Sequence, residues 1–371
     1  MPRDSITSVT PFAPSDSRKS TSVHPCPLAI DLDHIMAHTD GLWENLRGQK
    51  LFITGGTGFV GQWLLESFMR ANDELQLEAS VTVLTRDRAA FEQKAPALAA
   101  RSNLELHEGD VRTFQFPAGE YAACIHAATE ADSHVMASAP LQAFDINVEG
   151  ARQALEFARH AGVRRFLFTS SGAIYGNQPP ELDRIPEHFR GGPDPIDTQS
   201  TYGIPGEAKR AAESLCILYG RQYGFESVIA RCFTFVGPHL PLQAKFAIGN
   251  FIRDALAGGP IRIAGDGTPL RSYLYASDLT IWLWTLLFRG ASGQAYNVGS
   301  DEAYSISQVA ECVAQQLAVR PLITKAQRQD PLRPIHRYVP DITRARNELG
   351  LDVWTSLDAA IHKTLKFHGE R

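Results

Sequence analysis

The chain has 371 residues, a formal net charge of -5 and 44% hydrophobic residues. This length can fill one large domain, or a large and a small one, around a core that needs no disulfide staples. Lys and Arg are interspersed with acids, which excludes the basic footprint of a nucleic-acid-binding protein. The longest apolar run, at 279–288, is about half of the ~20 residues that a transmembrane helix needs, so we expect no contact with a membrane.

The cysteine content and the N-terminal segment both favour a cytoplasmic protein. The five cysteines form no Cys-x-x-Cys pair and are odd in number, so neither a disulfide framework nor a metal site is expected. A reducing compartment is the default for such a chain. Residues 1–27 are rich in Ser, Pro and Thr without the apolar core of a signal peptide, and we expect them to be disordered.

From residue 28 onward the chain shows regular apolar patterning. Residues 28–48 predict an N-terminal helical extension. Strands are then expected at 50–54, 80–85, 104–108, 121–126, 165–170 and 226–231, and helices at 61–72, 88–99, 141–161 and 206–223. This alternation predicts an α/β fold, a Rossmann-like doubly wound parallel sheet that forms a dinucleotide-binding domain over 49–240.

The pattern changes after residue 240. Helices alternate there with short strands, expected at 261–264, 273–276 and 295–298. We therefore expect residues 241–371 to form mainly a smaller C-terminal substrate-binding lobe, with some segments near 275–300 returning to the dinucleotide-binding domain.

The segment from Thr54 to Gly61, Thr-Gly-Gly-Thr-Gly-Phe-Val-Gly, is the most informative part of the sequence. It joins a short apolar strand to a helical pattern. A turn that passes close to two phosphates cannot carry Cβ atoms at its nearest points, and the following helix offers free N–H groups to an anion. The segment therefore predicts a dinucleotide pyrophosphate site, although glycines can also serve only to make a tight turn.

The end of the second strand bears on the choice of cofactor. An acid at this place accepts a hydrogen bond from the ribose 2′-hydroxyl of NAD, whereas an arginine pairs with the 2′-phosphate of NADP. Thr85 stands where the acid would be and Arg86 follows it. We expect NADP, with NAD as the alternative if Asp87 takes the role of the acid one residue later.

The glycine spacing resembles the Thr-Gly-x-x-Gly-x-x-Gly fingerprint of the extended short-chain dehydrogenase/reductase family. The resemblance implies that Gly55, Thr57, Gly58, Phe59, Val60 and Gly61 bind the cofactor. It extends this role to residues that follow the third and fourth strands and to one helix asparagine: Asp110, Val111, Ala127, Ala128, Thr129 and Asn147. A cytoplasmic homodimer, formed through the helices near 141–161 and 206–223, is also an expectation of the family.

The reaction centre of this family contains a serine, a tyrosine and a lysine. Ser171 aligns with the serine, and Tyr202 and Lys209 follow. A phenol titrates near ~10, and an ammonium group within about 4–6 Å favours phenolate, so that tyrosine can exchange a proton with a carbinol or ketone. Lys209 is expected to bind the cofactor as well.

The spacing between the tyrosine and the lysine departs from the family. The usual pattern is Tyr-x-x-x-Lys, but Pro205 stands four residues before Lys209 and Tyr202 stands seven before it. In one continuous helix the two side chains would be roughly 10 Å apart along the axis. We therefore expect a helix that begins near Pro205, with Tyr202 on the preceding loop and its ring folded back over Lys209. In the alternatives, Tyr175 or water supplies the proton, or the reaction has been lost.

The downstream half resembles the nucleotide-sugar epimerase/dehydratase branch of this family. The resemblance rests on four segments: Arg231 to Pro238, 249–252, Ile263 to Tyr273, and 296–299. They imply that Thr234, Asn250, Arg271, Arg328 and Arg333 bind the substrate, a nucleotide-diphosphate sugar. Arginine suits this task because its donors pair bidentately with phosphate oxygens.

Two small residues narrow the choice of reaction. The 4,6-dehydratases of the family carry an Asp-Glu pair directly after the catalytic Ser or Thr, where this chain has Gly172 and Ala173. We therefore expect an NAD(P)-dependent 4-epimerase or 4-ketoreductase acting at the sugar C4 carbinol or ketone. The alternatives are a 4,6-dehydratase or decarboxylase of the same family, and a catalytically impaired regulatory protein that binds the cofactor.

Overall fold

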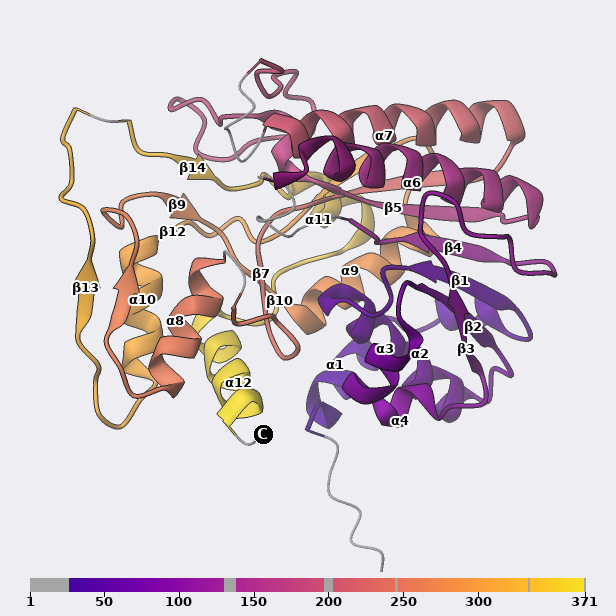
Figure 1. Ribbon diagram of the computed structural model, residues 1–371, viewed down its shortest axis with the longest axis horizontal. Coiled ribbons are helices and arrows are strands. Elements are labelled where there is room, and N and C mark those ends of the chain that lie inside the picture. Colours follow the sequence, from indigo (N-terminus) through magenta and orange to yellow (C-terminus); the bar gives the residue numbers. More distant parts are fainter. Residues whose placement is uncertain (1–26, 130–137, 197–202, 244–245, 333, 370–371) are drawn as a thin grey trace, which may run out of the picture.

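The computed structural model describes residues 27–129, 138–196, 203–243, 246–332 and 334–369. Figure 1 shows the N-terminal elements and the two long helices, α6 (Pro140–His160) and α7 (Gly203–Tyr223), on one side of the molecule. The C-terminal helices α8 (Ala247–Leu256), α10 (Ile306–Gln315) and α12 (Leu357–Gly369) lie on the other side. Residues 1–26, for which disorder is predicted, lie outside the described residues.

A seven-stranded parallel sheet forms the centre of the fold, in the order β11-β6-β5-β4-β1-β2-β3. Its strands are β1 (Lys50–Thr54), β2 (Ser80–Thr85), β3 (Leu104–Glu108), β4 (Ala123–His126), β5 (Arg165–Ser171), β6 (Glu226–Cys232) and β11 (Ala295–Val298). The strand order reverses between β1 and β4, whose carboxyl ends pair at Thr54 and His126. Ligands of open α/β sheets bind at such a switch point.

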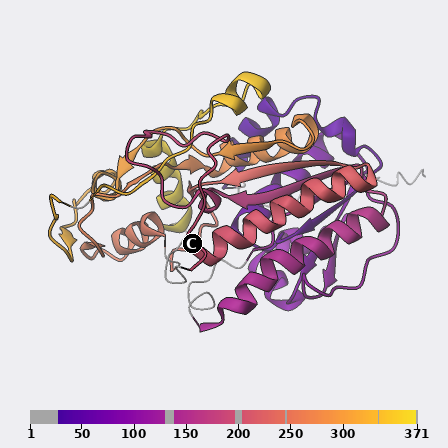
Figure 2. The same ribbon diagram turned by 90° about the horizontal axis from the view of Figure 1, so that it is seen from above.

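Helices cover both faces of this sheet, which confirms the predicted doubly wound α/β class. α6 (Pro140–His160) and α7 (Gly203–Tyr223) lie side by side on one face, over a core that includes Phe52, Phe157 and Phe166 (Figure 2). The expected dimer contact through these two helices stays a prediction.

The opposite face carries the N-terminal helices and α9 (Ala276–Arg289). Here α1 (Ala29–His38), η1 (Trp43–Leu46) and α2 (Phe59–Leu75) pack with α9 around buried tryptophans. α3 (Arg88–Lys94) and α4 (Pro96–Ala99) lie against the edge strand β3. The expected single helix over 88–99 is interrupted at Ala95, because the residue before a proline avoids the helical conformation.

The remaining elements form a separate core. α8 (Ala247–Leu256), α10 (Ile306–Gln315) and α12 (Leu357–Gly369) enclose an apolar cluster with the pair β8 (Ile261–Ile263) and β13 (Ile323–Lys325). Small sheets connect it to the centre: β7 (Phe235–Val236) with β10 (Leu274–Tyr275), and β9 (Leu270–Arg271) with β12 (Tyr304–Ser305) and β14 (Arg337–Tyr338). The short helices are η2 (Gly172–Tyr175) and α11 (Thr343–Leu349). The domain boundaries stay a prediction.

Candidate active site

The glycine turn after β1 packs tightly against the neighbouring strand. Gly55 has a φ of +72°, and a Cβ on it would lie 2.6 Å from backbone atoms of Ala127. A Cβ on Gly61 would lie 2.3 Å from the carbonyl oxygen of Gly55. These two glycines are therefore required by contacts within the protein itself, between the turn, β4 and the start of α2.

Gly58 differs from its two neighbours in the motif. It has a φ of -80° at the N-cap of α2, and a Cβ there would meet only the carbonyl oxygen of Gly55, at 3.4 Å. Gly58 lines a cavity of about 770 Å³. The free N–H groups at the start of α2 therefore border a hollow that a side chain at 58 would partly fill, which fits a bound pyrophosphate.

Most of the predicted cofactor residues line this cavity. They are Gly55, Thr57, Gly58, Phe59, Val60, Arg86, Asp110, Val111, Ala127, Ala128, Thr129 and Lys209. Gly61 and Asn147 are not part of its lining among the described residues. Asn147 instead supports a lining residue, because its Oδ1 accepts a hydrogen bond of 2.9 Å from the Thr129 hydroxyl.

Charged side chains follow β2 and β3 at one end of the cavity. Arg86 is exposed and lines the cavity. The Asp87 carboxylate accepts a hydrogen bond from the Ala90 N–H and caps α3, so it is already engaged. Asp110 is held by Arg112, whose guanidinium lowers the pKa of that carboxyl to about 2.

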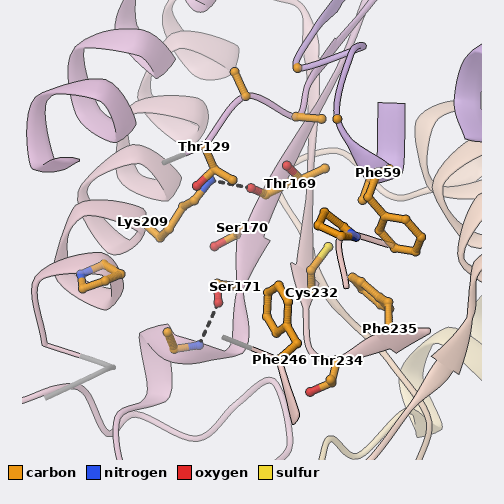
Figure 3. Close-up of a pocket in the computed structure, with 18 of the residues that line it drawn as sticks. Phe59, Thr129, Thr169, Ser170, Ser171, Lys209, Cys232, Thr234, Phe235 and Phe246 are labelled. Carbon is orange, nitrogen blue, oxygen red and sulfur yellow. Dashed lines mark hydrogen bonds between the residues drawn. The ribbon is translucent and has the colours of Figure 1, made fainter. Parts of the chain in front are cut away.

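Lys209 and Ser171 lie near each other on the cavity wall (Figure 3). Lys209 comes from α7 and is 5% exposed, and its Nζ donates a hydrogen bond of 2.8 Å to the Thr169 carbonyl. Ser171 ends β5, and its Oγ accepts a hydrogen bond of 3.1 Å from the Ala173 N–H. Among the described residues no acceptor is found for the Ser171 hydroxyl proton, which can therefore be donated to a ligand in the cavity.

Burial changes the pKa of Lys209. Desolvation lowers the pKa of its ammonium group to about 8, against small opposing effects of neighbours that include Glu213. The nearby His126 is fully buried, and burial, together with the charge of Lys209, lowers its pKa to about 3. His126 therefore stays neutral behind the site, and Lys209 carries the positive charge.

Tyr202 lies outside the described residues. α7 begins directly after it, at Gly203, two residues before the expected start at Pro205. Pro205 is accommodated because the first-turn N–H groups of a helix have no intrahelical partner, and it lines the cavity.

Tyr175, the alternative proton donor, is buried in a different environment. Its hydroxyl donates a 2.7 Å hydrogen bond to Asn297 and accepts one of 2.8 Å from Arg231. Burial raises the pKa of the phenol above its ordinary value. Tyr175 is absent from the described lining of the cavity. This environment argues against Tyr175 as the proton donor.

Glu213 links α7 to the end of the sheet, a role that sequence reasoning missed. Its carboxylate accepts hydrogen bonds from the Ser170 hydroxyl at 2.5 Å and from Arg231 Nη2 at 2.8 Å. Glu213 lies one helical turn after Lys209, so both side chains of α7 hold neighbouring residues of β5. That four-residue spacing was the available signal, but it does not reveal the partners.

The predicted substrate residues fall into separate places. Thr234 and Arg271 line the main cavity. Asn250 lines an adjacent hollow of about 210 Å³. Arg328 is exposed, and the described lining of neither cavity includes it. Arg333 lies outside the described residues.

Aromatic side chains form much of the remaining cavity lining, which the motif analysis did not predict. They are Phe233, Phe235, Phe246, Tyr273 and Tyr338. A Cβ on Gly172 would lie 2.7 Å from both the Phe233 ring and the Tyr338 hydroxyl oxygen. The rings therefore occupy the space that a side chain at 172 would need, which explains the glycine.

Two negative findings apply to the described part of the chain. Within it, every helix is too short or too polar to cross a bilayer. The same residues contain no group of three His, Cys, Asp or Glu side chains placed to hold a metal ion.

The chain is similar to curated enzymes along most of its length. It is 29% identical over 322 residues to UDP-glucuronic acid decarboxylase 1 of Xenopus tropicalis, covering 86% of this chain and 72% of the relative. It is 30% identical over 337 residues to UDP-glucuronic acid decarboxylase 5 of Arabidopsis thaliana, covering 91% and 92%. These names favour the decarboxylase alternative over the expected 4-epimerase or 4-ketoreductase.

Solved structures share the fold. A UDP-glucose 4-epimerase of Thermotoga maritima, with UDP-glucose, aligns with a TM-score of 0.71 at 20% identity, covering 86% of this chain and 99% of the other. A dTDP-glucose 4,6-dehydratase of Bacillus anthracis, in complex with NAD, gives 0.71 at 18% identity, covering 87% and 97%. RMD of Pseudomonas aeruginosa, complexed with NADPH, gives 0.68 at 23% identity, covering 87% and 99%.

A family model covers the glycine turn, nearly all of the central sheet and most of the residues that line the cavity. The match runs over residues 51–299 and is described as the NAD dependent epimerase/dehydratase family. Together with the fold and the curated relatives, it shows that the chain belongs to the NAD dependent epimerase/dehydratase family.

Proposed function

We propose that this protein is an NAD(P)-dependent enzyme that oxidises or reduces C4 of a nucleotide-diphosphate sugar. The observation that carries the proposal is the buried ammonium of Lys209, held 2.8 Å from the Thr169 carbonyl on the wall of the cavity that the glycine turn borders. A buried lysine with no role in binding or catalysis would destabilise the folded protein without benefit, because desolvation disfavours its charged form.

The chain's own residues can transfer the proton to or from the C4 oxygen. In the proposed relay the Ser171 hydroxyl donates a hydrogen bond to the C4 oxygen, which places that oxygen beside the tyrosine. Tyr202 gives or takes the proton, and the positive charge of Lys209 makes the phenol more acidic. A nicotinamide cofactor, when bound, supplies or accepts the hydride. The position of the Tyr202 ring is part of the proposal.

We propose NADP(H) as the cofactor. Arg86 lies exposed at the cavity, where its guanidinium can pair with a 2′-phosphate, whereas Oδ1 of Asp87 accepts a hydrogen bond from the Ala90 N–H at the N-cap of α3. Exchanging Arg86 for Asp should reverse the preference. We expect the ratio of the dissociation constants of NADP⁺ and NAD⁺ to rise at least ~100-fold in this variant, because it removes one ion pair and adds a repulsion. An unchanged ratio would contradict this assignment.

Decarboxylation of a sugar acid is the second candidate, favoured by the curated relatives. Oxidation at C4 places a ketone next to C5, the carbon that bears the carboxylate. When the C5–C6 bond then breaks, its electron pair passes to the C4 carbonyl to give an enolate and CO₂ leaves; C5 next takes up a proton from an acid or from water, and C4 takes back the hydride. The bond cleavage removes no proton from C5 and expels no water, so Gly172 and Ala173 permit it while disfavouring a 4,6-dehydratase.

The test is a substrate panel with both cofactors. Purified protein is incubated with UDP-, dTDP-, GDP- and CDP-sugars, including UDP-glucuronate, while absorbance at the nicotinamide band and product masses are followed. We expect oxidation or reduction at C4 with at least one sugar. Release of CO₂ from UDP-glucuronate would select the second candidate. Cofactor binding without change in any sugar would refute both and identify a regulatory protein.

A further inference from the structure

Two side chains of α7, one helical turn apart, hold two consecutive residues of β5. The Lys209 ammonium donates a 2.8 Å hydrogen bond to the Thr169 carbonyl. The Glu213 carboxylate accepts a hydrogen bond of 2.5 Å from the Ser170 hydroxyl. Ser171 is the next residue of the strand, and Figure 3 shows it in chain order after these two residues, beside Lys209. The place of Ser171 relative to α7 therefore depends on both contacts.

Arg231 fixes the Glu213 carboxylate from the opposite side. Its guanidinium donates to both carboxylate oxygens, from Nε at 3.1 Å and from Nη2 at 2.8 Å. Its Nη1 donates in turn to the Tyr175 hydroxyl and to the Glu187 carbonyl. The Arg231 and Glu213 side chains are 14% and 11% exposed, so water screens the pair little. A bidentate pair in such a setting holds the carboxylate in one position.

Glu213 also acts on the charge of Lys209. The other titratable groups that act on this buried ammonium, within the described residues, are His126 on β4, Cys216 on α7 and Cys232 on β6. His126 is neutral, and burial raises the pKa of both thiols, that of Cys232 to about 12. Glu213 is therefore the only anion in this described group. Since a nearby negative charge favours the ammonium, loss of the Glu213 charge should lower the pKa of Lys209 below about 8.

The proposed function, on which this inference rests, needs Ser171 and Lys209 in a fixed relation. Ser171 holds the C4 oxygen, and Lys209 makes the phenol beside that oxygen more acidic. A displacement of about 1 Å in such an arrangement reduces the rate by ~100-fold. Glu213 is absent from the described lining of the cavity, so it acts through its neighbours. We propose that Glu213 is a positioning residue of this reaction centre: its carboxylate fixes Ser171 relative to Lys209 and supplies the negative charge that stabilises the ammonium.

The first test is Glu213→Gln, which keeps the size of the side chain and removes its charge. The kcat and KM for reduction of a C4 ketone are measured from about pH 6 to about pH 10, and folding is checked by thermal unfolding. We expect kcat to fall at least ~10-fold at about pH 7, with little change in KM. The decline of kcat at high pH should begin at least ~0.5 pH unit lower than in the wild type.

Glu226→Gln is the matched control. Glu226 pairs with Arg165 between the same two strands, β6 and β5, but at their amino ends, where its side chain is exposed. Its kcat and pH profile should equal those of the wild type. A folded Glu213→Gln with wild-type kcat and an unchanged pH profile would overturn the inference and leave the proposed function intact. No turnover of any sugar by the wild type would overturn both.

The second test separates position from charge. Ser170→Ala removes the hydrogen bond to Glu213 but keeps the ion pair with Arg231, so it decides the question even where Glu213→Gln does not fold. We expect kcat to fall at least ~5-fold, while its decline at high pH begins where it does in the wild type. Wild-type kcat in Ser170→Ala would mean that this contact does not place Ser171, and would overturn the inference.

Discussion

Replacing Lys209 with methionine tests the proton relay without changing the length of the side chain much. An ammonium group near a phenol lowers the phenol pKa by about 1–3 units, so its loss reduces the phenolate fraction by about 10- to 1000-fold at fixed pH. We therefore expect kcat to fall by about 10- to 1000-fold, while KM for the sugar changes little. The structural cost is one hydrogen bond to the Thr169 carbonyl, about 1 kcal/mol.

The assay measures kcat and KM at the nicotinamide absorbance band, with thermal unfolding as a check on folding. Arg221→Met is the matched control, because Arg221 is an exposed cation on the same helix. The pH dependence adds a second readout. The pKa of Lys209 is lowered to about 8, so the ammonium is charged below that pH and is lost above it. Ketone reduction should therefore weaken above pH 8 in the wild type. Wild-type kcat in Lys209→Met would refute the relay.

Three further predictions concern cofactor binding and stability. Gly58→Val should keep the fold, since a Cβ at this position meets only the Gly55 carbonyl oxygen, at 3.4 Å. The side chain should raise the dissociation constant of NADP⁺ at least ~100-fold, because it fills the hollow proposed for the pyrophosphate. Equal affinity of the variant and the wild type in a fluorescence titration would contradict this. Glu213→Ala removes the carboxylate that pairs with the largely buried Arg231 guanidinium. The free energy of unfolding in urea should fall by about 3–5 kcal/mol, against less than about 1 kcal/mol for the exposed ion-pair control Glu74→Ala. The pKa of His126 is lowered to about 3, so only the unfolded chain takes up this proton as the pH falls below about 6.5, and the free energy of unfolding falls by about 1.4 kcal/mol per pH unit. In His126→Gln the plot of the free energy of unfolding against pH should be shallower by that amount. Equal slopes in the two proteins between pH 4.5 and 6 would disprove the burial of a neutral imidazole.

The central sheet could be predicted from sequence because its strands are short apolar runs bounded by turns. β2 and β3 have the predicted bounds: β2 is an almost continuous buried run, and the edge strand β3 alternates buried with more exposed residues. The start of α7 at Gly203 was harder to predict from sequence, because Gly and Pro normally disfavour a helix. Tertiary packing outweighs that local preference.

The residues proposed to bind the cofactor were identified from motifs that are contiguous in sequence, such as the glycine turn. The rest depends on contacts between distant segments. Glu213, Arg231, Tyr175 and Asn297 come from α7, β6, η2 and β11 and meet in one buried network. The aromatic side chains of the cavity lining are likewise brought together only by the fold. No spacing rule in one sequence reveals such partners.

Transfer of hydrogen from C4 of the sugar tests the central claim most directly. Nucleotide sugars carrying deuterium at C4, with methyl, hydroxymethyl or carboxylate at C6, are incubated with oxidised cofactor, and the cofactor is examined by mass spectrometry. We predict that deuterium appears on the nicotinamide with wild-type protein and not with Tyr202→Phe. Retention of all deuterium on every sugar, by a protein that binds the cofactor, would contradict the account.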